Sequence, residues 1–330
     1  MRRFAVTASA LLAVALAACS TGDPEAAANG GTPASEGVAG GGGGTPASEG
    51  VAGGGGGTPA SEGVAGGGGG TPASEGVAGG GGNGRSPAPT DGDVQELRVR
   101  VLERLPHDAE AFTQGLELRG DVLYESTGLE GSSSVRRGPV GGAPTVRRDL
   151  PAPFFGEGLT LVGPRLWQLT WQNGIAFERE ADTLKELRRV RYEGEGWGLC
   201  LDRTDGGTGG RLVMSDGSAR LTFRDPETFE PTGHVDVTRA GAPVDQLNEL
   251  ECTPDGSVYA NVYQTDTLVR IDPDTGAVTA DIDAAGLLGP AELRAGAREL
   301  NGIAAVPGGD EFLLTGKYWP RMFRVEFVAR

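Results

Sequence analysis

Five copies of a short pattern each place a polar or aromatic side chain at the same position. The copies start at intervals of roughly 40 to 53 residues, and each is followed by a loop and an apolar run. A carboxyl can move a proton, amides can hydrogen-bond a carbonyl, and an aromatic ring can enclose an apolar group. Five copies arranged about an axis would bring these side chains into one ring. The five residues are Gln114, Glu157, Trp197, Asn248 and Asn301.

A second recurring position lies four residues beyond the second residue of each apolar run. It holds Gly128 and Gly217 in two copies, and Trp171, Tyr263 and Lys317 in the other three. A repeat of this length is one supersecondary unit that buries its apolar face only against its neighbours. We therefore expect Trp171, Tyr263 and Lys317 to lie close to the ring.

The elements that must position these residues are short strands. Runs such as Arg211–Met214, Val258–Val262 and Leu268–Ile271 alternate or are apolar, and Gly, Pro, Asp and Asn bound them. The period is typical of four-stranded propeller blades, so residues 92–330 are predicted to form an all-β, five-bladed β-propeller. Leu97–Leu102 would close the ring by joining the last blade. A two-sheet sandwich is the rival architecture, but it does not require fivefold recurrence.

Only one segment has a helical pattern. Ala284–Arg298 has the composition of a helix, but several glycines and one proline interrupt it. The stretch Asp205–Gly210 is rich in glycine and indicates a loop insertion away from the chemistry.

The chain starts with a predicted export signal, residues 1–19. Arg2 and Arg3 precede an apolar run that ends at Leu16-Ala17-Ala18-Cys19 and is short for a membrane span. This ending resembles a bacterial lipobox, in which Cys19 is lipidated and becomes the mature N-terminus. We expect an exported protein, anchored to a bacterial membrane through lipid on Cys19. An ordinary cleaved signal with an unrelated cysteine is the alternative.

Residues 20–91 are predicted to be a disordered linker. A 13-residue Gly-rich unit starts at Thr32, Thr45 and Thr58, and returns nearly complete at Thr71. Such a unit buries too little apolar surface to offset chain entropy. A flexible tether and a repeat expansion without function are both open.

Charge and composition exclude some functions. The formal net charge of −16 is opposite in sign to the basic face that nucleic-acid binding requires. We also expect a monomer. His107 and His234 have no histidine or cysteine at ligand spacing, so a zinc site is not predicted. Cys200 and Cys252 would form a disulfide after export or remain buried thiols, and the sequence leaves both possibilities open.

Longer motifs surround the recurring positions. From about Val99 onward they occur in an order that resembles the plant and bacterial type of glutaminyl-peptide cyclotransferase. The motifs are Pro106-His107-Asp108, Ala111-Phe112-Thr113-Gln114-Gly115, Phe154-Phe155-Gly156-Glu157-Gly158-Leu159, Gly194-Glu195-Gly196-Trp197-Gly198-Leu199, Asn248-Glu249-Leu250-Glu251 and Thr315-Gly316-Lys317.

The resemblance implies a five-bladed propeller that converts N-terminal glutamine of peptides and proteins into pyroglutamate, with no cofactor and no catalytic metal. Where the family usually has tryptophan, this chain has Tyr263, which puts the fit of the substrate at that wall in question. The residues that match the family's pocket are Phe112, Gln114, Phe155, Glu157, Trp171, Trp197, Asn248 and Lys317.

Glu157 is the predicted proton shuttle, because an apolar setting raises the pKa of a carboxyl toward the useful range. Lys317, with Gln114 and Asn248, would hydrogen-bond the oxyanion. A structural ion pair between Glu157 and Lys317 is the alternative. Two other classes also remain open, namely a non-catalytic tethered binding propeller and a metal-dependent propeller hydrolase or lactonase. His107 is expected to pack or to stabilise a turn.

Overall fold

The computed structural model describes residues 94–204 and 209–330. The predicted signal, Cys19 and the linker at 20–91 lie outside the described residues, as does most of the predicted insertion Asp205–Gly210. The described residues hold a single helix, α1 (Pro290–Arg294), within the segment where the sequence has a helical pattern. No helix in these ranges is long and apolar enough to cross a membrane. The fold is therefore all-β, as the sequence predicts.

Three antiparallel sheets have four strands each, connected in chain order. Short turns rich in Gly, Asp and Asn connect neighbouring strands, as expected for hairpins. The strands are β2 (Thr113–Arg119), β3 (Val122–Thr127), β4 (Ser134–Pro139) and β5 (Val146–Asp149); β6 (Gly156–Val162), β7 (Arg165–Thr170), β8 (Ile175–Glu180) and β9 (Glu186–Arg191); and β10 (Leu199–Asp202), β11 (Arg211–Ser215), β12 (Arg220–Arg224) and β13 (Pro231–Asp236).

The remaining strands form an eight-stranded sheet and one small ribbon. The N-terminal strand β1 (Gln95–Pro106) pairs antiparallel with the C-terminal strand β22 and parallel with β19, so it joins two groups of strands. The other strands of the sheet are β16 (Leu247–Cys252), β17 (Val258–Val262), β18 (Thr267–Ile271), β19 (Val278–Asp283), β20 (Leu300–Ala305), β21 (Glu311–Gly316) and β22 (Arg321–Ala329), and the ribbon is β14 (Thr238–Arg239) with β15 (Ala242–Pro243).

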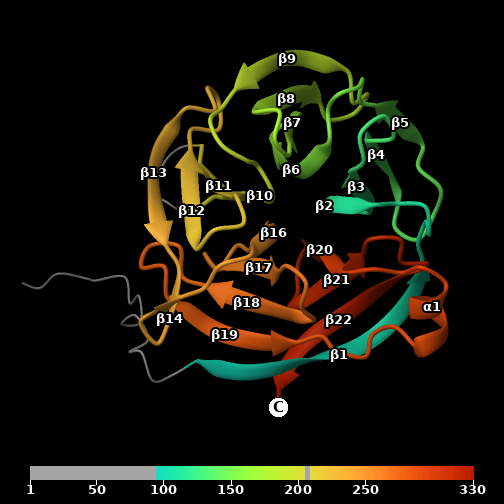
Figure 1. Cartoon of the computed structure of the whole chain (residues 1–330), viewed down its shortest axis with the longest axis vertical. Coiled ribbons are helices and arrows are strands. Elements are labelled where there is room, and N and C mark those ends of the chain that lie inside the picture. Colours follow the sequence, from blue (N-terminus) through green and yellow to red (C-terminus); the bar gives the residue numbers. More distant parts are fainter. Residues whose placement is uncertain (1–93, 205–208) are drawn as a thin grey trace, which may run out of the picture. The chain divides into compact units, whose positions relative to one another are not determined.

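The five strands that start at the recurring tetrapeptides lie at the centre (Figure 1). β2 contacts β6, β6 contacts β10, β10 contacts β16, β16 contacts β20, and β20 contacts β2. These contacts form a closed circuit in chain order. Four-stranded sheets arranged around such a circuit are consistent with a propeller.

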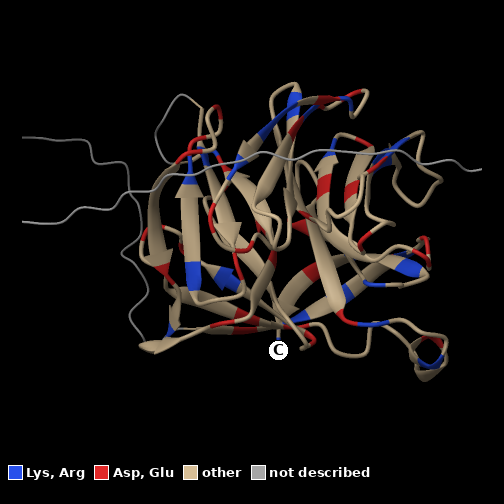
Figure 2. Ribbon diagram, turned by 45° about the horizontal axis from the view of Figure 1, so that its top comes forward, with Lys and Arg blue, Asp and Glu red and all other residues tan. Residues whose placement is uncertain are grey.

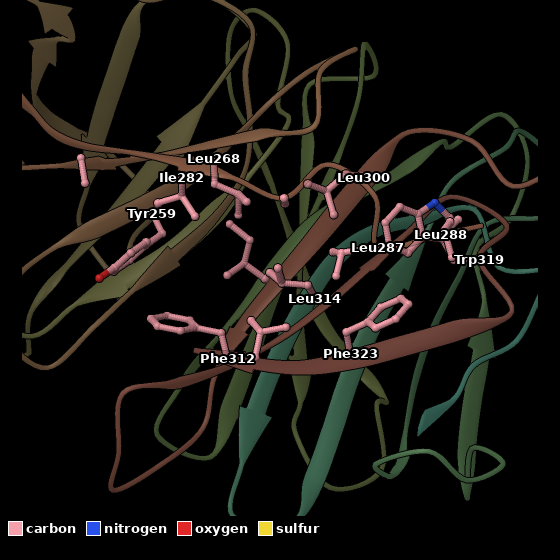
Figure 3. Packing of buried hydrophobic residues seen from close by; sticks show 14 residues of the cluster. Tyr259, Leu268, Ile282, Leu287, Leu288, Leu300, Phe312, Leu314, Trp319 and Phe323 are labelled. Atoms are coloured by element: carbon pink, nitrogen blue, oxygen red, sulfur yellow. The ribbon is translucent and has the colours of Figure 1, made fainter. Parts of the chain in front are cut away.

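Apolar side chains fill the space between neighbouring groups of strands. Figure 3 shows the largest cluster, in which Leu268 and Tyr259 face Phe312, Leu314 and Phe323. The rings of Tyr259 and Phe312 lie 4.8 Å apart between centroids. Each fully buried side chain of this size stabilises the fold by about 1.5–3 kcal/mol, so this contact holds β17 and β18 against β21 and β22.

Cys200 and Cys252 are joined in a disulfide. The bond connects β10 to the last residue of β16, across 52 residues of sequence. It decides between the two possibilities that the sequence left open, and it ties one four-stranded sheet to the eight-stranded sheet. Disulfides of this kind are typical of exported proteins.

Charged side chains of both signs are interspersed along the outer strands. In Figure 2 Lys and Arg alternate with Asp and Glu on the same sheets. Several cross-strand pairs connect them, for example Arg220 with Asp236 and Arg165 with Glu178.

Candidate active site

Four of the five recurring positions are β-bulges at the start of the innermost strands. The pairing register shifts around Gln114 in β2, around Glu157 in β6, around Asn248 in β16 and around Asn301 in β20. Trp197, at the fifth position, lies two residues before the start of β10 and donates its backbone N–H to the carbonyl of Ser215. A bulge redirects a side chain that would otherwise follow the pleat, which is why bulges are frequent at active sites. The repeat thus directs one chemical group from each unit toward the centre.

Three of these side chains form a hydrogen-bonded chain. Gln114 donates from Nε2 to Oε1 of Glu157 at 2.6 Å, and Asn301 donates from Nδ2 to Oε1 of Gln114 at 3.1 Å. All three side chains are buried. Oε2 of Glu157 and Oδ1 of Asn301 are also buried but have no hydrogen-bond partner in the described residues. Buried polar atoms without a partner are uncommon in folded proteins, so these two atoms mark the centre of the ring as unusual.

Burial raises the pKa of Glu157 well above its ordinary value. The charge of Lys317 and the hydrogen bond from Gln114 lower it, while the charge of Glu195 raises it further. Because burial dominates, the pKa of this carboxyl lies well above that of an exposed glutamate. A raised pKa makes a carboxyl a better proton acceptor when it is ionised, which suits a group that takes up and returns a proton.

Lys317 lies between two aromatic faces. Its Nζ is 4.8 Å from the ring centroid of Phe112 and 4.7 Å from that of Tyr263. Burial lowers the pKa of Lys317, against the charge of Glu157, which raises it. Among the described residues no ion pair within 4.0 Å joins Lys317 to Glu157. The ammonium is therefore held by ring faces and is not neutralised by a direct carboxylate contact.

Aromatic side chains continue the wall on both sides of Lys317. Phe112 meets Phe155 edge-on at 6.0 Å, and Phe155 meets Trp171 at 5.5 Å. On the other side, Tyr263 meets Trp197 at 5.6 Å. Trp171 is the exposed end of the wall, at 36% of its surface. The structure thus brings all the predicted aromatic residues into one wall, shared with Lys317.

Glu195 connects the two ends of this wall. Its Oε2 accepts hydrogen bonds from the indole N–H of Trp171 at 2.8 Å and of Trp197 at 2.9 Å. No role for Glu195 is predicted from the sequence. The available signal was its position two residues before Trp197, between two glycines, in one of the family motifs.

Two glycines make room for the wall. Gly128 lies against the ring of Phe155, and a Cβ at Gly217 would lie 2.6 Å from the ring of Trp197. Gly217 also has φ of +82°, which side chains other than glycine rarely adopt. These glycines occupy the second recurring position, where other copies carry Trp171, Tyr263 or Lys317.

Asn248 occupies the recurring position in β16, but its side chain makes no hydrogen bond to the other described residues. Its backbone carbonyl accepts the hydroxyl of Ser215. The following residue, Glu249, is a second one that sequence reasoning missed. It accepts the backbone N–H of Leu116 at 3.0 Å and of Ile303 at 2.7 Å, so it connects three innermost strands.

His107 has the structural role that the sequence favours. Its ring contacts the carbonyl of Trp319 at 2.7 Å and Oε1 of Glu125 at 3.1 Å. Glu125 also accepts hydrogen bonds from Thr113 and Arg136. This buried network anchors the segment that carries Phe112 and Gln114.

A cavity of about 720 Å³ lies at the opposite ends of the innermost strands. Glu117, Leu201 and Glu251 are among its lining residues, and none of the predicted site residues lines it. Within the described ranges, no group of three or more His, Cys, Asp or Glu side chains is arranged to hold a metal ion. The candidate chemistry thus belongs to the other ends of the strands, around Glu157.

An all-β fold with a buried carboxyl, an ammonium and an aromatic wall defines a candidate site for acyl-transfer chemistry. The sequence profile of the glutamine cyclotransferase family matches residues 81–327, and the chain belongs to that family.

Two similar proteins support this membership. A curated glutaminyl-peptide cyclotransferase of Arabidopsis thaliana is 37% identical over 234 residues, which cover 69% of this chain and 71% of the plant protein. The crystal structure of Myxococcus xanthus glutaminyl cyclase has 37% sequence identity and a TM-score of 0.63. That match covers 72% of this chain and 100% of the Myxococcus chain.

Proposed function

We infer that this chain is a glutaminyl-peptide cyclotransferase, which converts the N-terminal glutamine of peptides and proteins into pyroglutamate and releases ammonia. Family membership supports the activity. The structural observation that carries the chemistry is the free Oε2 of Glu157, buried beside Lys317 and within an aromatic wall. A titratable carboxyl and a cation at one point match what intramolecular aminolysis of an amide requires.

Glu157 is the proposed proton shuttle. The substrate's α-amine attacks the carbon of its own side-chain amide, and a C–N bond closes the five-membered ring. The proton released by the amine passes to Glu157 and then to the amide nitrogen, which leaves as ammonia when the old C–N bond breaks. Since a free α-amine titrates near ~7.7–8, a moderate base is sufficient. Gln114 holds Oε1, so that Oε2 points to the reacting atoms.

Lys317 is the proposed stabiliser of the oxyanion that forms on the amide carbonyl. Its ammonium is buried and forms no ion pair among the described residues, so its positive charge is available to a developing negative charge. The side-chain amide of Asn248 has no hydrogen-bond partner among the described residues and is the proposed second donor. Asn301 holds Gln114 and thereby orients Glu157 indirectly.

The aromatic wall is proposed to select the folded-back conformer of the glutamine. Cyclisation needs the amine and the amide carbon in contact, and a narrow enclosure removes the extended conformers. The wall residues are Phe112, Phe155, Trp171, Trp197 and Tyr263.

The reaction is proposed to need no metal. Gln114 Oε1 accepts a hydrogen bond from Asn301, and one oxygen of Glu157 accepts a hydrogen bond from Gln114, so these atoms are not free to ligate a cation. Mass spectrometry of a Gln-initiated peptide, incubated with the protein, would detect the loss of ammonia. Turnover that survives exhaustive chelation is the expected result. Turnover that ends with chelator and returns with metal would instead support a metal-dependent propeller.

The architecture is proposed to be a five-bladed propeller. The closed circuit of five innermost strands supports it, and so does β1, which completes a last group with β20, β21 and β22. In this arrangement the eight-stranded sheet is two adjacent blades that β1 joins through its parallel contact with β19. We expect the propeller to act as a monomer.

The protein is proposed to be exported and anchored to a bacterial membrane through lipid on Cys19. The sequence around Cys19 and the disulfide between Cys200 and Cys252 support export. Cys19→Ala should release the protein from membranes or block its processing, while the activity of the domain is unchanged. Fractionation of cells that express the variant tests this, and normal processing with retained membrane attachment would contradict it.

A further inference from the structure

We propose that Glu195 is a positioning residue for the cyclisation, which holds the indoles of Trp171 and Trp197 at a fixed separation across the substrate pocket. The carboxylate accepts both indole N–H groups on a single oxygen, Oε2, at 2.8 and 2.9 Å. Its other oxygen accepts the side-chain amide of Gln172 at 2.8 Å. One carboxylate thus sets the relative placement of two rings from different segments.

The two tryptophans have few contacts with other aromatic rings in the described residues. Trp171 follows the end of β7 and is 36% exposed, with its ring packed edge-on against Phe155. Trp197 lies two residues before β10, and the aromatic ring that it meets there is that of Tyr263, edge-on. Edge-on contacts fix an indole less tightly than a hydrogen bond to a charged acceptor does.

The backbone around Glu195 is shaped for this contact. Gly194 has φ of +81°, which a side chain would strain. The N–H of Gly196 donates to the carbonyl of Trp171 at 3.0 Å, so the loop is tied to the residue whose indole it also holds. A Cβ at Gly196 would collide with the hydroxyl group of Tyr192. The glycines on both sides of Glu195 therefore let its carboxylate reach the N–H edges of the two indoles.

The hydrogen bonds also keep Glu195 charged. Burial acts to raise the pKa of Glu195, but the hydrogen bonds from Trp197, Gln172 and Trp171 outweigh it and hold the pKa below its ordinary value. An ionised acceptor makes stronger hydrogen bonds than a neutral one, although a neutral carbonyl oxygen can accept the same two N–H groups.

The inference rests on the proposed function, because it needs the substrate glutamine to lie between the two rings. Glu195→Ala removes the acceptor and should lower kcat/KM for a Gln-initiated peptide by roughly 10- to 100-fold, the scale of a misplaced contact. Glu195→Gln keeps a carbonyl oxygen that can accept both indole N–H groups. Its new NH₂ group can donate to Gln172 once the amide of Gln172 has rotated to present its oxygen. The Glu195→Gln variant should therefore retain most of the activity.

Glu193→Gln is the matched control, since Glu193 is an exposed carboxylate on the same loop and its loss should leave kcat/KM unchanged. The background Trp171→Phe/Trp197→Phe has no indole N–H to hold, so adding Glu195→Ala there should cause little further loss. Tryptophan fluorescence should show easier acrylamide quenching in Glu195→Ala than in Glu195→Gln. Circular dichroism and thermal unfolding confirm that each variant is folded.

The outcomes separate the inference from the proposed function. If the unmodified protein does not cyclise the peptide, the proposed function is wrong. If it does, but Glu195→Gln loses as much activity as Glu195→Ala, the charge and not the placement of the indoles is what matters, and the inference is overturned. An equal loss from Glu195→Ala with and without the indole N–H groups would also overturn it.

Discussion

At the scale of single residues, the site depends on a difference between the two buried oxygens of Glu157. Gln114 holds one oxygen, and the other is enclosed without a partner. Leaving a buried acceptor unsatisfied costs about 1–3 kcal/mol, and proteins retain that cost mainly where a ligand removes it. Burial also raises the pKa of this carboxyl. The unsatisfied oxygen and the proton chemistry therefore have the same physical cause.

Glu157→Gln should reduce turnover by ~10²–10⁴-fold, the range of general acid–base contributions. The amide keeps the shape of the side chain and its hydrogen bonding, but it cannot take up and return a proton. Steady-state kinetics with a Gln-initiated peptide measures the loss, and thermal unfolding of the same sample serves as the control for the fold. A variant with near-normal turnover would assign the proton transfer to another group.

Lys317→Met should slow catalysis by ~10²–10³-fold, the scale of a lost oxyanion donor. Methionine keeps an unbranched apolar stem between the rings of Phe112 and Tyr263, so the wall should stay in place. We expect kcat to fall more than KM rises, because the oxyanion exists only after the amine attacks. A change confined to KM would show that Lys317 binds the ground state instead.

At the scale of elements, one structural feature recurs. A β-bulge at the start of an innermost strand directs a polar side chain inward. The equivalence of these positions could be predicted from sequence, since the tetrapeptide repeat places Gln114, Glu157, Asn248 and Asn301 in equivalent contexts, but the bulge itself could not. The contacts between units could not be predicted. Glu195 and Glu249 act across units, and nothing in the spacing of one repeat says which residue of the next it meets.

Gly217→Ala should impair both the fold and the wall, because the added methyl would meet the ring of Trp197 at a backbone φ of +82°. Gly163→Ala is the matched control, since Gly163 has φ of +57° in another turn and open space around it. We expect both variants to lose stability, by on the order of 1 kcal/mol, from backbone strain. Only Gly217→Ala should also lower kcat/KM, and an equal effect on activity from both would contradict the steric argument.

At the scale of the whole described unit, the strands fixed by local patterns were predicted well. Val258–Val262 is a strand with the predicted bounds, and Arg211–Met214 and Leu268–Ile271 each gain one residue. Closure of the sheet by β1 was expected for the pairing with β22, but the additional parallel pairing with β19 was not. Parallel contacts between distant strands leave no local signature, because they depend on how neighbouring units come together.

Removal of residues 1–91 should leave the unfolding midpoint and kcat/KM of the soluble protein unchanged. The reason is that the Gly-rich unit has too few apolar side chains to contribute to a core, whereas β1, which begins at Gln95, remains intact. A longer deletion, which removes all of β1 so that the protein starts at His107, is the contrasting variant. It removes a strand that pairs with both β19 and β22 and whose residues Leu97, Val99 and Val101 pack on the cluster of Figure 3. We expect this variant to unfold at much lower denaturant concentration or to aggregate, since β19 and β22 would then expose unpaired edges. Equal stability of the two truncated proteins would show that β1 does not close the fold, and a large loss from the shorter deletion would show that the linker takes part in it.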